Sequence, residues 1–157
     1  MRTGIGFDCH RLAPDRKLVL GGVHVPFGKG LIGWSDADAL THSVIDALLG
    51  AAAMGDIGMH FPPGDPAYKN ISSLKLLEEV VTKLEGQGFQ INNVDATVLA
   101  EQPRLREYVD EMRANLADVL GIDVSRVSVK ASTSNLLGFI GREEGIAGIA
   151  VATVISK

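Results

Sequence analysis

The segment from Ile146 to Ile155 constrains the fold most, because it is apolar throughout and carries no charged residue. A run this apolar predicts a strand at the centre of a β-sheet, covered by neighbouring strands and packed layers. At the other end of the chain, Met1–Cys9 alternates small or polar residues with larger ones. This period of two predicts a second strand, so we expect a fold built around a sheet.

The middle of the chain predicts further strands and the helices that cover the sheet. Short apolar runs on either side of Gly21-Gly22 predict a hairpin. The sequence Ser35–Asp38 is expected to open a helix, with Ser35 as its N-cap. The segment Met54–Lys69, rich in glycine and proline, is expected to be a loop long enough to suggest a function. The other expected elements are strands 17–20, 23–27, 94–99 and 127–131, a helix with inward residues Val44, Ile45, Leu48, Leu49 and Ala52, a helix 72–85 with inward residues Leu74, Leu77, Val80, Val81 and Leu84, and a helix 106–120.

Strands and helices alternate without a repeat or a linker, which predicts one layered domain over residues 1–157, α+β or α/β. We expect the α+β class, with a mixed β-sheet and helices packed on one face. The net charge of −4 provides no basic face for nucleic acid, and no stretch approaches the ~20 apolar residues of a membrane span. A single cysteine and the lack of a signal-peptide pattern predict a cytoplasmic protein.

Asp8-Cys9-His10 places three residue types that bind metals side by side. Because side chains alternate along a strand, Asp8 and His10 are expected on one face, where they can hold one ion. Cys9 is expected on the opposite face, in the core with Ile5 and Phe7. Taken alone, this short pattern is also compatible with an ordinary strand end.

A third ligand would have to come from another segment. His42 is the strongest of the remaining histidines, because Asp38 and Asp46 lie one turn before and after it on the expected helix. A carboxylate one turn away can orient a metal-bound imidazole. A solvated helix face with ordinary acidic residues explains the spacing equally well. His24 and His60 are expected to be surface residues.

Several longer motifs, in order along the whole chain, resemble those of the 2-C-methyl-D-erythritol 2,4-cyclodiphosphate synthase family. They are Gly4-Ile5-Gly6-Phe7-Asp8-Cys9-His10, Ser35-Asp36-Ala37-Asp38 with His42, Asp46-Ala47-Leu48-Leu49-Gly50-Ala51, Gly55-Asp56-Ile57-Gly58, Phe61-Pro62-Pro63-Gly64-Asp65-Pro66, and Gly138-Phe139-Ile140-Gly141-Arg142-Glu143-Glu144-Gly145-Ile146.

The resemblance implies a homotrimer with active sites between subunits and a role in the non-mevalonate isoprenoid pathway. The implied substrate is 4-diphosphocytidyl-2-C-methyl-D-erythritol 2-phosphate. Its 2-phosphate attacks the β-phosphorus of the diphosphate, which closes a cyclic diphosphate and releases CMP. The formal class is a phosphorus–oxygen lyase. In such a reaction the protein supplies positioning and charge neutralisation, because the nucleophile belongs to the substrate.

The resemblance also implies the site residues. Zn²⁺, or another divalent metal, is expected at Asp8, His10 and His42, with Mg²⁺ or Mn²⁺ on the substrate diphosphate. Thr133, Ser35 and Trp34 occupy the expected catalytic positions. The expected substrate-binding residues are Asp8, Cys9, His10, Asp56, Ile57, Gly58, Phe61, Pro62, Pro63, Gly64, Asp65, Ala100, Glu101, Gln102, Pro103, Arg104, Leu105, Arg106, Ser132, Ser134, Asn135, Phe139 and Arg142.

Two positions depart from the family pattern. Trp34 replaces the usual histidine, and its indole donates one hydrogen bond but carries no charge. Asn135 replaces the usual glutamate, which predicts weaker recruitment of Mg²⁺ by the protein. Pro63-Gly64 also replaces the commoner Asp-Thr, whereas Asp65 is retained.

Two alternatives remain open from the sequence. One is a catalytically weakened relative that binds an isoprenoid diphosphate in the central channel of the trimer, where Phe7, Arg142 and Glu144 match residues of the family. The other is a different zinc phosphohydrolase. Residues such as Arg142 and the hydroxyl-rich Ser132–Ser134 also have ordinary structural explanations, an ion pair and a turn.

Overall fold

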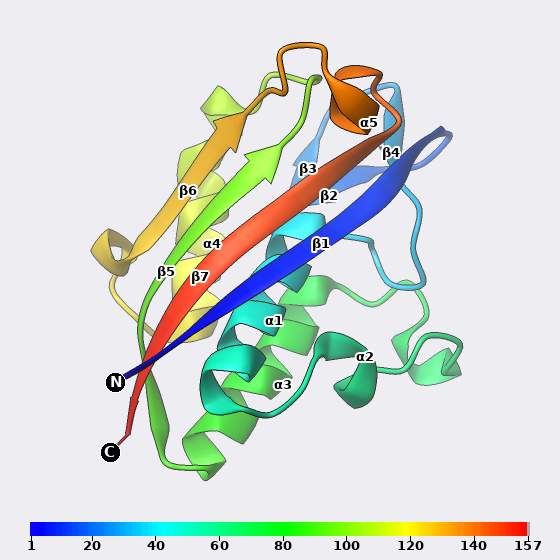
Figure 1. Cartoon of the computed structure of the whole chain (residues 1–157). Helices are drawn as coiled ribbons and strands as arrows, with labels where there is room; N and C mark the ends of the chain where they lie inside the picture. Colours follow the sequence, from blue (N-terminus) through cyan, green and yellow to red (C-terminus); the bar gives the residue numbers. More distant parts are fainter. Residues whose placement is uncertain (157) are drawn as a thin grey trace.

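The apolar C-terminal segment forms strand β7 (Gly145–Ser156), at the centre of a five-stranded sheet (Figure 1). This is a computed structural model that describes residues 1–156, so Lys157 of the expected domain lies outside the described residues. The strand order is β4-β1-β7-β5-β6. Only β5 and β6 pair in parallel, so the predicted mixed sheet with a central β7 is confirmed. The other strands are β1 (Arg2–Pro14), β4 (Lys29–Leu31), β5 (Phe89–Leu99) and β6 (Val127–Ser132).

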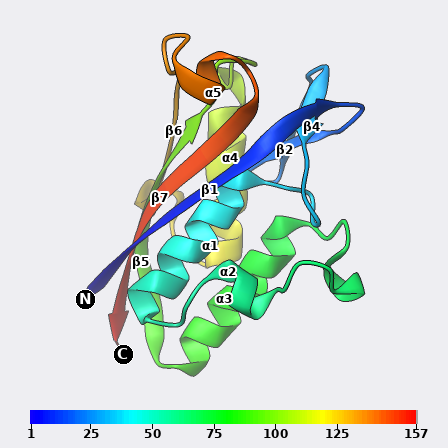
Figure 2. The ribbon, with the colours of Figure 1, turned by 45° about the vertical axis from the view of Figure 1, so that its right-hand side comes forward.

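Three helices cover one face of the sheet (Figure 2). They are α1 (Ala39–Ala52), α3 (Ser73–Gly86) and α4 (Val109–Leu120). Helix α1 lies directly on β1, β7 and β5, α3 packs against α1, and α4 lies beside β6. Their apolar stripes and the inner face of the sheet form one hydrophobic cluster, as the patterning predicts.

Glycines on the inner face of the sheet allow α1 to approach the strands closely. A Cβ atom at Gly6 would lie 2.0 Å from the carbonyl oxygen of Ser43, and one at Gly4 would lie 2.1 Å from that of Ala47. Neither position has room for a side chain, so the backbones of β1 and α1 are in contact. This contact brings His42 on α1 beside Asp8 on β1.

The start of α1 corrects the expected cap. The N-cap is Asp38, whose carboxylate accepts a hydrogen bond from the backbone N–H of Thr41. The prediction for Ser35 was wrong, because its hydroxyl lies too early in the chain and is turned toward His42 instead. On α3, Leu74 and Val81 are half-buried rather than inward, and Leu76 takes an inward position.

The remaining helices and strands are short, and most of them lie within the segments that connect the longer elements. The predicted hairpin is confirmed as β2 (Leu18–Leu20) and β3 (Val23–Val25). The expected loop 54–69 contains α2 (Ile57–His60) and the 3₁₀ turn η1 (Pro66–Tyr68). The turn η2 (Arg106–Tyr108) precedes α4, which therefore begins three residues later than expected. Elements that the sequence did not predict are β4, η3 (Val124–Arg126) and α5 (Gly138–Gly141).

Within residues 1–156, no helix covers the part of the outer sheet face formed by Ile5, Phe7, Cys9 and Val151. Ile5 is 71% exposed, Phe7 55% and Val151 38%, and Cys9 is exposed as well. The expectation that Cys9, Ile5 and Phe7 belong to the core is therefore wrong for the single chain, although they do face away from Asp8 and His10. An exposed apolar strip of this kind marks an interaction surface.

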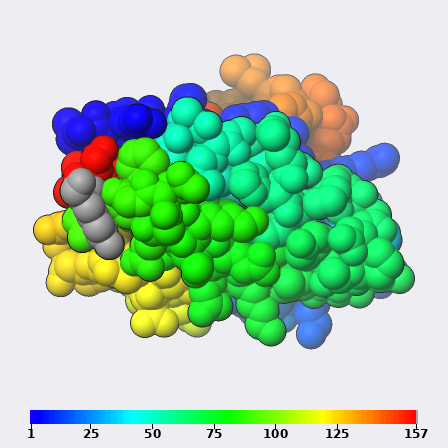
Figure 3. All heavy atoms as spheres, turned by 90° about the horizontal axis from the view of Figure 1, so that it is seen from below, coloured from blue at the N-terminus to red at the C-terminus, as the bar shows by residue number. Residues whose placement is uncertain are grey.

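The two ends of the chain lie side by side. Arg2 pairs with Val154 in the sheet, and the space-filling view from below shows the dark blue N-terminal residues beside the red end of β7 (Figure 3). None of the helices in residues 1–156 has the length and hydrophobicity of a membrane-spanning segment.

Candidate functional site

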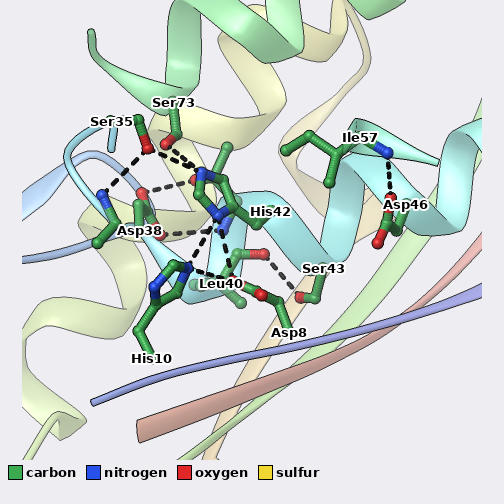
Figure 4. Close-up of polar contacts among 12 residues, drawn as sticks. Asp8, His10, Ser35, Asp38, Leu40, His42, Ser43, Asp46, Ile57 and Ser73 are labelled. Atoms are coloured by element: carbon green, nitrogen blue, oxygen red, sulfur yellow. Dashed lines mark hydrogen bonds and ion pairs between the residues drawn. The ribbon is translucent and has the colours of Figure 1, made fainter. Parts of the chain in front are cut away.

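Asp8, His10 and His42 converge at one point between β1 and α1 (Figure 4). Asp8 Oδ2 lies 2.8 Å from His10 Nε2 and 3.1 Å from His42 Nδ1. The two imidazole nitrogens are 3.2 Å apart. The strand period and the close contact of α1 therefore bring together the three residues expected to bind a metal.

The outer nitrogen of His10 is held by the backbone. Nδ1 lies 2.8 Å from the carbonyl oxygen of Ile32, which can only accept a hydrogen bond, so Nδ1 carries the proton. Gly33 makes room for this ring, because a Cβ atom there would lie 3.1 Å from His10 Cε1. In the neutral imidazole, Nε2 then presents its lone pair toward Asp8.

The outer nitrogen of His42 is held by two hydroxyl groups. Nε2 lies 2.8 Å from Ser73 Oγ and 3.2 Å from Ser35 Oγ. Ser73 donates its own proton to the carboxylate of Asp36, so its oxygen accepts the proton of His42 Nε2. The chain Asp36–Ser73–His42 thus leaves the lone pair of Nδ1 directed at Asp8.

With these tautomers, Asp8 Oδ2, His10 Nε2 and His42 Nδ1 all direct lone pairs at one point. A positive charge at that point is needed to make the arrangement favourable. Burial alone raises the pKa of Asp8, but hydrogen bonds from His10 and His42, in the form in which these imidazoles also carry a proton toward the carboxylate, outweigh burial and hold that pKa well below its usual range. Burial likewise lowers the pKa of His10, and Asp8 outweighs that effect and raises it. A proton can supply the missing charge, and a divalent cation supplies more of it to a carboxylate and two imidazoles. The residues present therefore fit a divalent metal.

Asp38 and Asp46 do not orient His42, which corrects that expectation. Asp38 is fully buried and accepts hydrogen bonds from the backbone N–H groups of Gly21 and Gly22 as well as from Thr41. Asp46 accepts from the N–H of Ile57, 2.7 Å away, and so anchors the loop before α2. Both carboxylates bind backbone N–H groups; Asp38 is fully buried, whereas Asp46 is half-buried and partly open to solvent.

A cavity of about 320 Å³ opens onto the three candidate ligands. Of the residues expected from the sequence, Trp34, Ser35, Ile57, Gly58, Phe61 and Pro63 line it together with Asp8, His10 and His42. The sequence did not identify Ser73, Tyr68 or Leu76 at this site. Ser73 was given only as part of a helix, and nothing local distinguishes it from Ser72. His60 is half-buried, and its Nε2 donates to the carbonyl oxygen of Met54, so the prediction of a surface residue is only partly correct.

A second cavity, of about 420 Å³, lies beside the edge strand β6. It is lined by residues expected to cradle the nucleotide and by the start of the hydroxyl-rich segment: Ala100, Glu101, Pro103, Arg104, Leu105, Arg106, Ser132 and Thr133. The two cavities share no lining residue. Cys9, Ala147, Leu99 and Ser132 form one row across the sheet, so three ladder steps of ~4.8 Å, about 14 Å, separate β1 from β6.

Further expected site residues lie in the segment after β6, which contacts Glu101. Glu101 accepts hydrogen bonds from the N–H groups of Ser134 and Leu136, 3.2 and 3.4 Å away, and so ties the two loops together. Asn135 has a left-handed backbone, with φ of 54°, which asparagine tolerates well. Arg142 forms the alternative ion pair with Glu144, with Nε 3.0 Å from Oε1.

The mixed sheet covered by helices, with an Asp-His-His cluster at a cavity, defines an α+β protein with a candidate divalent-metal centre. Residues 1–155 match the YgbB family, and the chain belongs to that family. The 2-C-methyl-D-erythritol 2,4-cyclodiphosphate synthase of Dehalococcoides mccartyi strain 195 is 64% identical over 157 residues, the full length of both chains. The synthase of Lachnospira eligens is 55% identical and is covered over 85% of its length.

Solved structures agree with this assignment. The IspF–CDP complex of Plasmodium falciparum superposes with a TM-score of 0.87 at 32% identity, covering 99% of this chain and 96% of that one. The bifunctional IspDF of Campylobacter jejuni superposes with a TM-score of 0.95 at 41% identity. The match covers 99% of this chain but only 42% of the bifunctional protein.

Proposed function

We propose that the chain is a 2-C-methyl-D-erythritol 2,4-cyclodiphosphate synthase of the non-mevalonate isoprenoid pathway. It converts 4-diphosphocytidyl-2-C-methyl-D-erythritol 2-phosphate to the cyclic diphosphate and CMP, as a phosphorus–oxygen lyase acting in the cytoplasm. The observation that carries this proposal is the Asp8-His10-His42 cluster in a chain of this family. Residues 1–157 act as a single domain in this proposal.

Asp8, His10 and His42 would hold Zn²⁺ or another divalent metal, and Mg²⁺ or Mn²⁺ would accompany the substrate diphosphate. Bound there, a divalent ion neutralises charge on the phosphoryl oxygens and polarises phosphorus. Ser35 donates to a phosphate oxygen beside His42. The sugar would be enclosed by the segments Asp56–Gly58 and Phe61–Asp65, which would also shield the reacting groups from water.

The cavity beside β6 is proposed to hold the cytidine, since structures of the relatives are described as CDP complexes. Thr133 would stabilise the transition state, with Ser132, Ser134 and Asn135 toward the phosphates. Gln102 closes the nucleotide loop between Glu101 and Pro103, and Cys9, Phe139 and Arg142 remain predicted contacts.

We further propose a homotrimer in which the metal cavity of one subunit faces the nucleotide cavity of its neighbour. The separation of the two cavities across β7 and β5 supports this arrangement, because one substrate has to contact both. The exposed strip of Ile5, Phe7 and Val151 supports it as well. An isoprenoid diphosphate in the central channel, near Phe7, Arg142 and Glu144, remains a further predicted partner.

The decisive experiment measures CMP release from the substrate with Zn²⁺ and Mg²⁺, with and without a chelator. We expect release by the wild type, loss of activity after chelation, and recovery when metal is restored. His42→Ala should remain folded and lose at least 100-fold in rate, because a three-residue centre becomes a two-residue one. Wild-type protein that binds metal but releases no CMP would refute the proposed function, and release of inorganic phosphate would indicate a phosphohydrolase instead.

A further inference from the structure

Trp34 lies in the segment 32–35, whose other residues contact or make room for the candidate metal ligands His10 and His42. The carbonyl group of Ile32 accepts from His10, Gly33 leaves room for that imidazole, and Ser35 contacts His42. Trp34 is 39% exposed and lines the same cavity. Its contacts, however, are directed away from the candidate ligands.

The indole and the backbone of Trp34 hold both ends of the segment 65–70. Trp34 Nε1 donates to the carbonyl oxygen of Asp65 at 2.7 Å, and the carbonyl oxygen of Trp34 accepts from the N–H of Asn70 at 2.8 Å. The ammonium group of Lys69 lies 5.9 Å from the centre of the indole ring, within range of a cation–π contact. Three contacts therefore join one residue to a segment some thirty positions later.

The segment held in this way forms one wall of the cavity. Pro63 and Tyr68, on either side of Asp65, both line it, and Tyr68 packs edge-on against Phe61 with ring centres 5.3 Å apart. The carbonyl oxygen of Asp65 also accepts from the N–H of Tyr68, so the indole completes the turn that directs Tyr68 inward. The side-chain N–H of Trp34 is fully used by this bond, because an indole has only one donor.

We infer that Trp34 is a positioning residue that fixes the 62–70 wall of the metal cavity and so prepares it for substrate. A residue in this role acts on binding rather than on the chemical step. Its removal should raise KM while kcat changes little, because the unbound wall becomes mobile and has to be ordered when substrate binds. The kinetic part of this inference rests on the proposed function, whereas the structural part does not.

Amide hydrogen exchange of Trp34→Phe tests the structural part directly. The variant keeps a six-membered aromatic ring but loses the N–H donor and part of the indole surface. We therefore expect amides in 62–70 to exchange at least about fivefold faster, the ratio given by one net hydrogen bond of ~1 kcal/mol. Peptides from α1 should be unchanged. Tyr108→Phe, which removes an aromatic donor from η2, is the matched control and should leave 62–70 unaltered. Trp34→Leu, which removes the ring and its donor together, provides a second variant should the first fold poorly.

Unchanged exchange of 62–70 in a folded Trp34 variant would overturn the inference. In the kinetic assay we expect KM to rise about fivefold with kcat within twofold of the wild type and unaltered Zn²⁺ affinity. A fall in kcat at constant KM would make Trp34 a catalytic residue and also contradict the inference. If the wild type releases no CMP, the proposed function fails by itself, and the exchange measurement still decides the role of Trp34.

Discussion

At the scale of single residues, the candidate metal centre depends on groups that set the orientation of the imidazoles. The buried Ser73 accepts from His42 Nε2 and donates to Asp36. Such outer contacts fix the tautomer and direction of a ligand, and their removal typically lowers metal affinity by 10- to 100-fold.

Ser73→Ala should therefore lower the affinity for Zn²⁺ by about 10- to 100-fold with little loss of fold. Titration with a competing chelator measures this change without an activity assay. Ser72→Ala is the matched control, because Ser72 precedes it at the start of α3 and makes no capping hydrogen bond through its side chain. Equal affinities in the two variants would show that Ser73 does not support the centre.

The sequence predicted the three candidate ligands better than their supports. The strand period separates Asp8 and His10 from Cys9, and the resemblance supplies His42. Ser73, however, lies 31 positions after His42, and only the packing of α3 on α1 brings the two together. Asp38 and Asp46 have the expected helical spacing relative to His42. Their carboxylates, however, accept hydrogen bonds from backbone N–H groups of other segments and do not contact the imidazole.

At the scale of elements, the contact of β1 with α1 positions the site. Gly6→Ala would place a Cβ atom 2.0 Å from a backbone oxygen of α1, so helix and strand would have to separate. We expect a loss of about 1–3 kcal/mol or more in the free energy of unfolding, together with weaker metal binding. Gly28→Ala, where nothing lies within 4 Å of the added atom, should be close to neutral in the same thermal or denaturant measurement. Equal stabilities for the two variants would contradict this account of the interface.

Elements with a strong period were predictable, and short elements were not. The apolar content of residues 146–155 predicted the central strand, and the amphipathic patterns predicted helices α1 and α3. By contrast, β4 contains three residues, Lys29–Leu31, and forms because it pairs with the end of β1. The long-range pairing partner, rather than local propensity, decides such an element.

At the scale of the whole molecule, the outer sheet face exposes an apolar strip of Ile5, Phe7 and Val151 in the part of the chain that the structure describes. Val151→Glu or Ile5→Glu should dissociate the proposed trimer, since a buried unpaired charge costs several kcal/mol. Sedimentation or light scattering measures the molecular mass. Val124→Glu is the matched control, because Val124 is 45% exposed in η3 and lies outside this sheet face. A monomeric wild type, or a trimer unaffected by both outer-face variants, would refute the assembly.

The pairing of the first and last strands brings both ends of the described chain to the edge of the sheet that is remote from the candidate ligands. Arg2 lies beside Val154, whereas the candidate ligand His10 is eight residues, about 26 Å, further along β1. A second polypeptide can therefore be attached at this end without obstructing either cavity, and the chain should also tolerate circular permutation through a short linker. The same fold occurs within the longer bifunctional IspDF of Campylobacter jejuni, of which the match covers 42%.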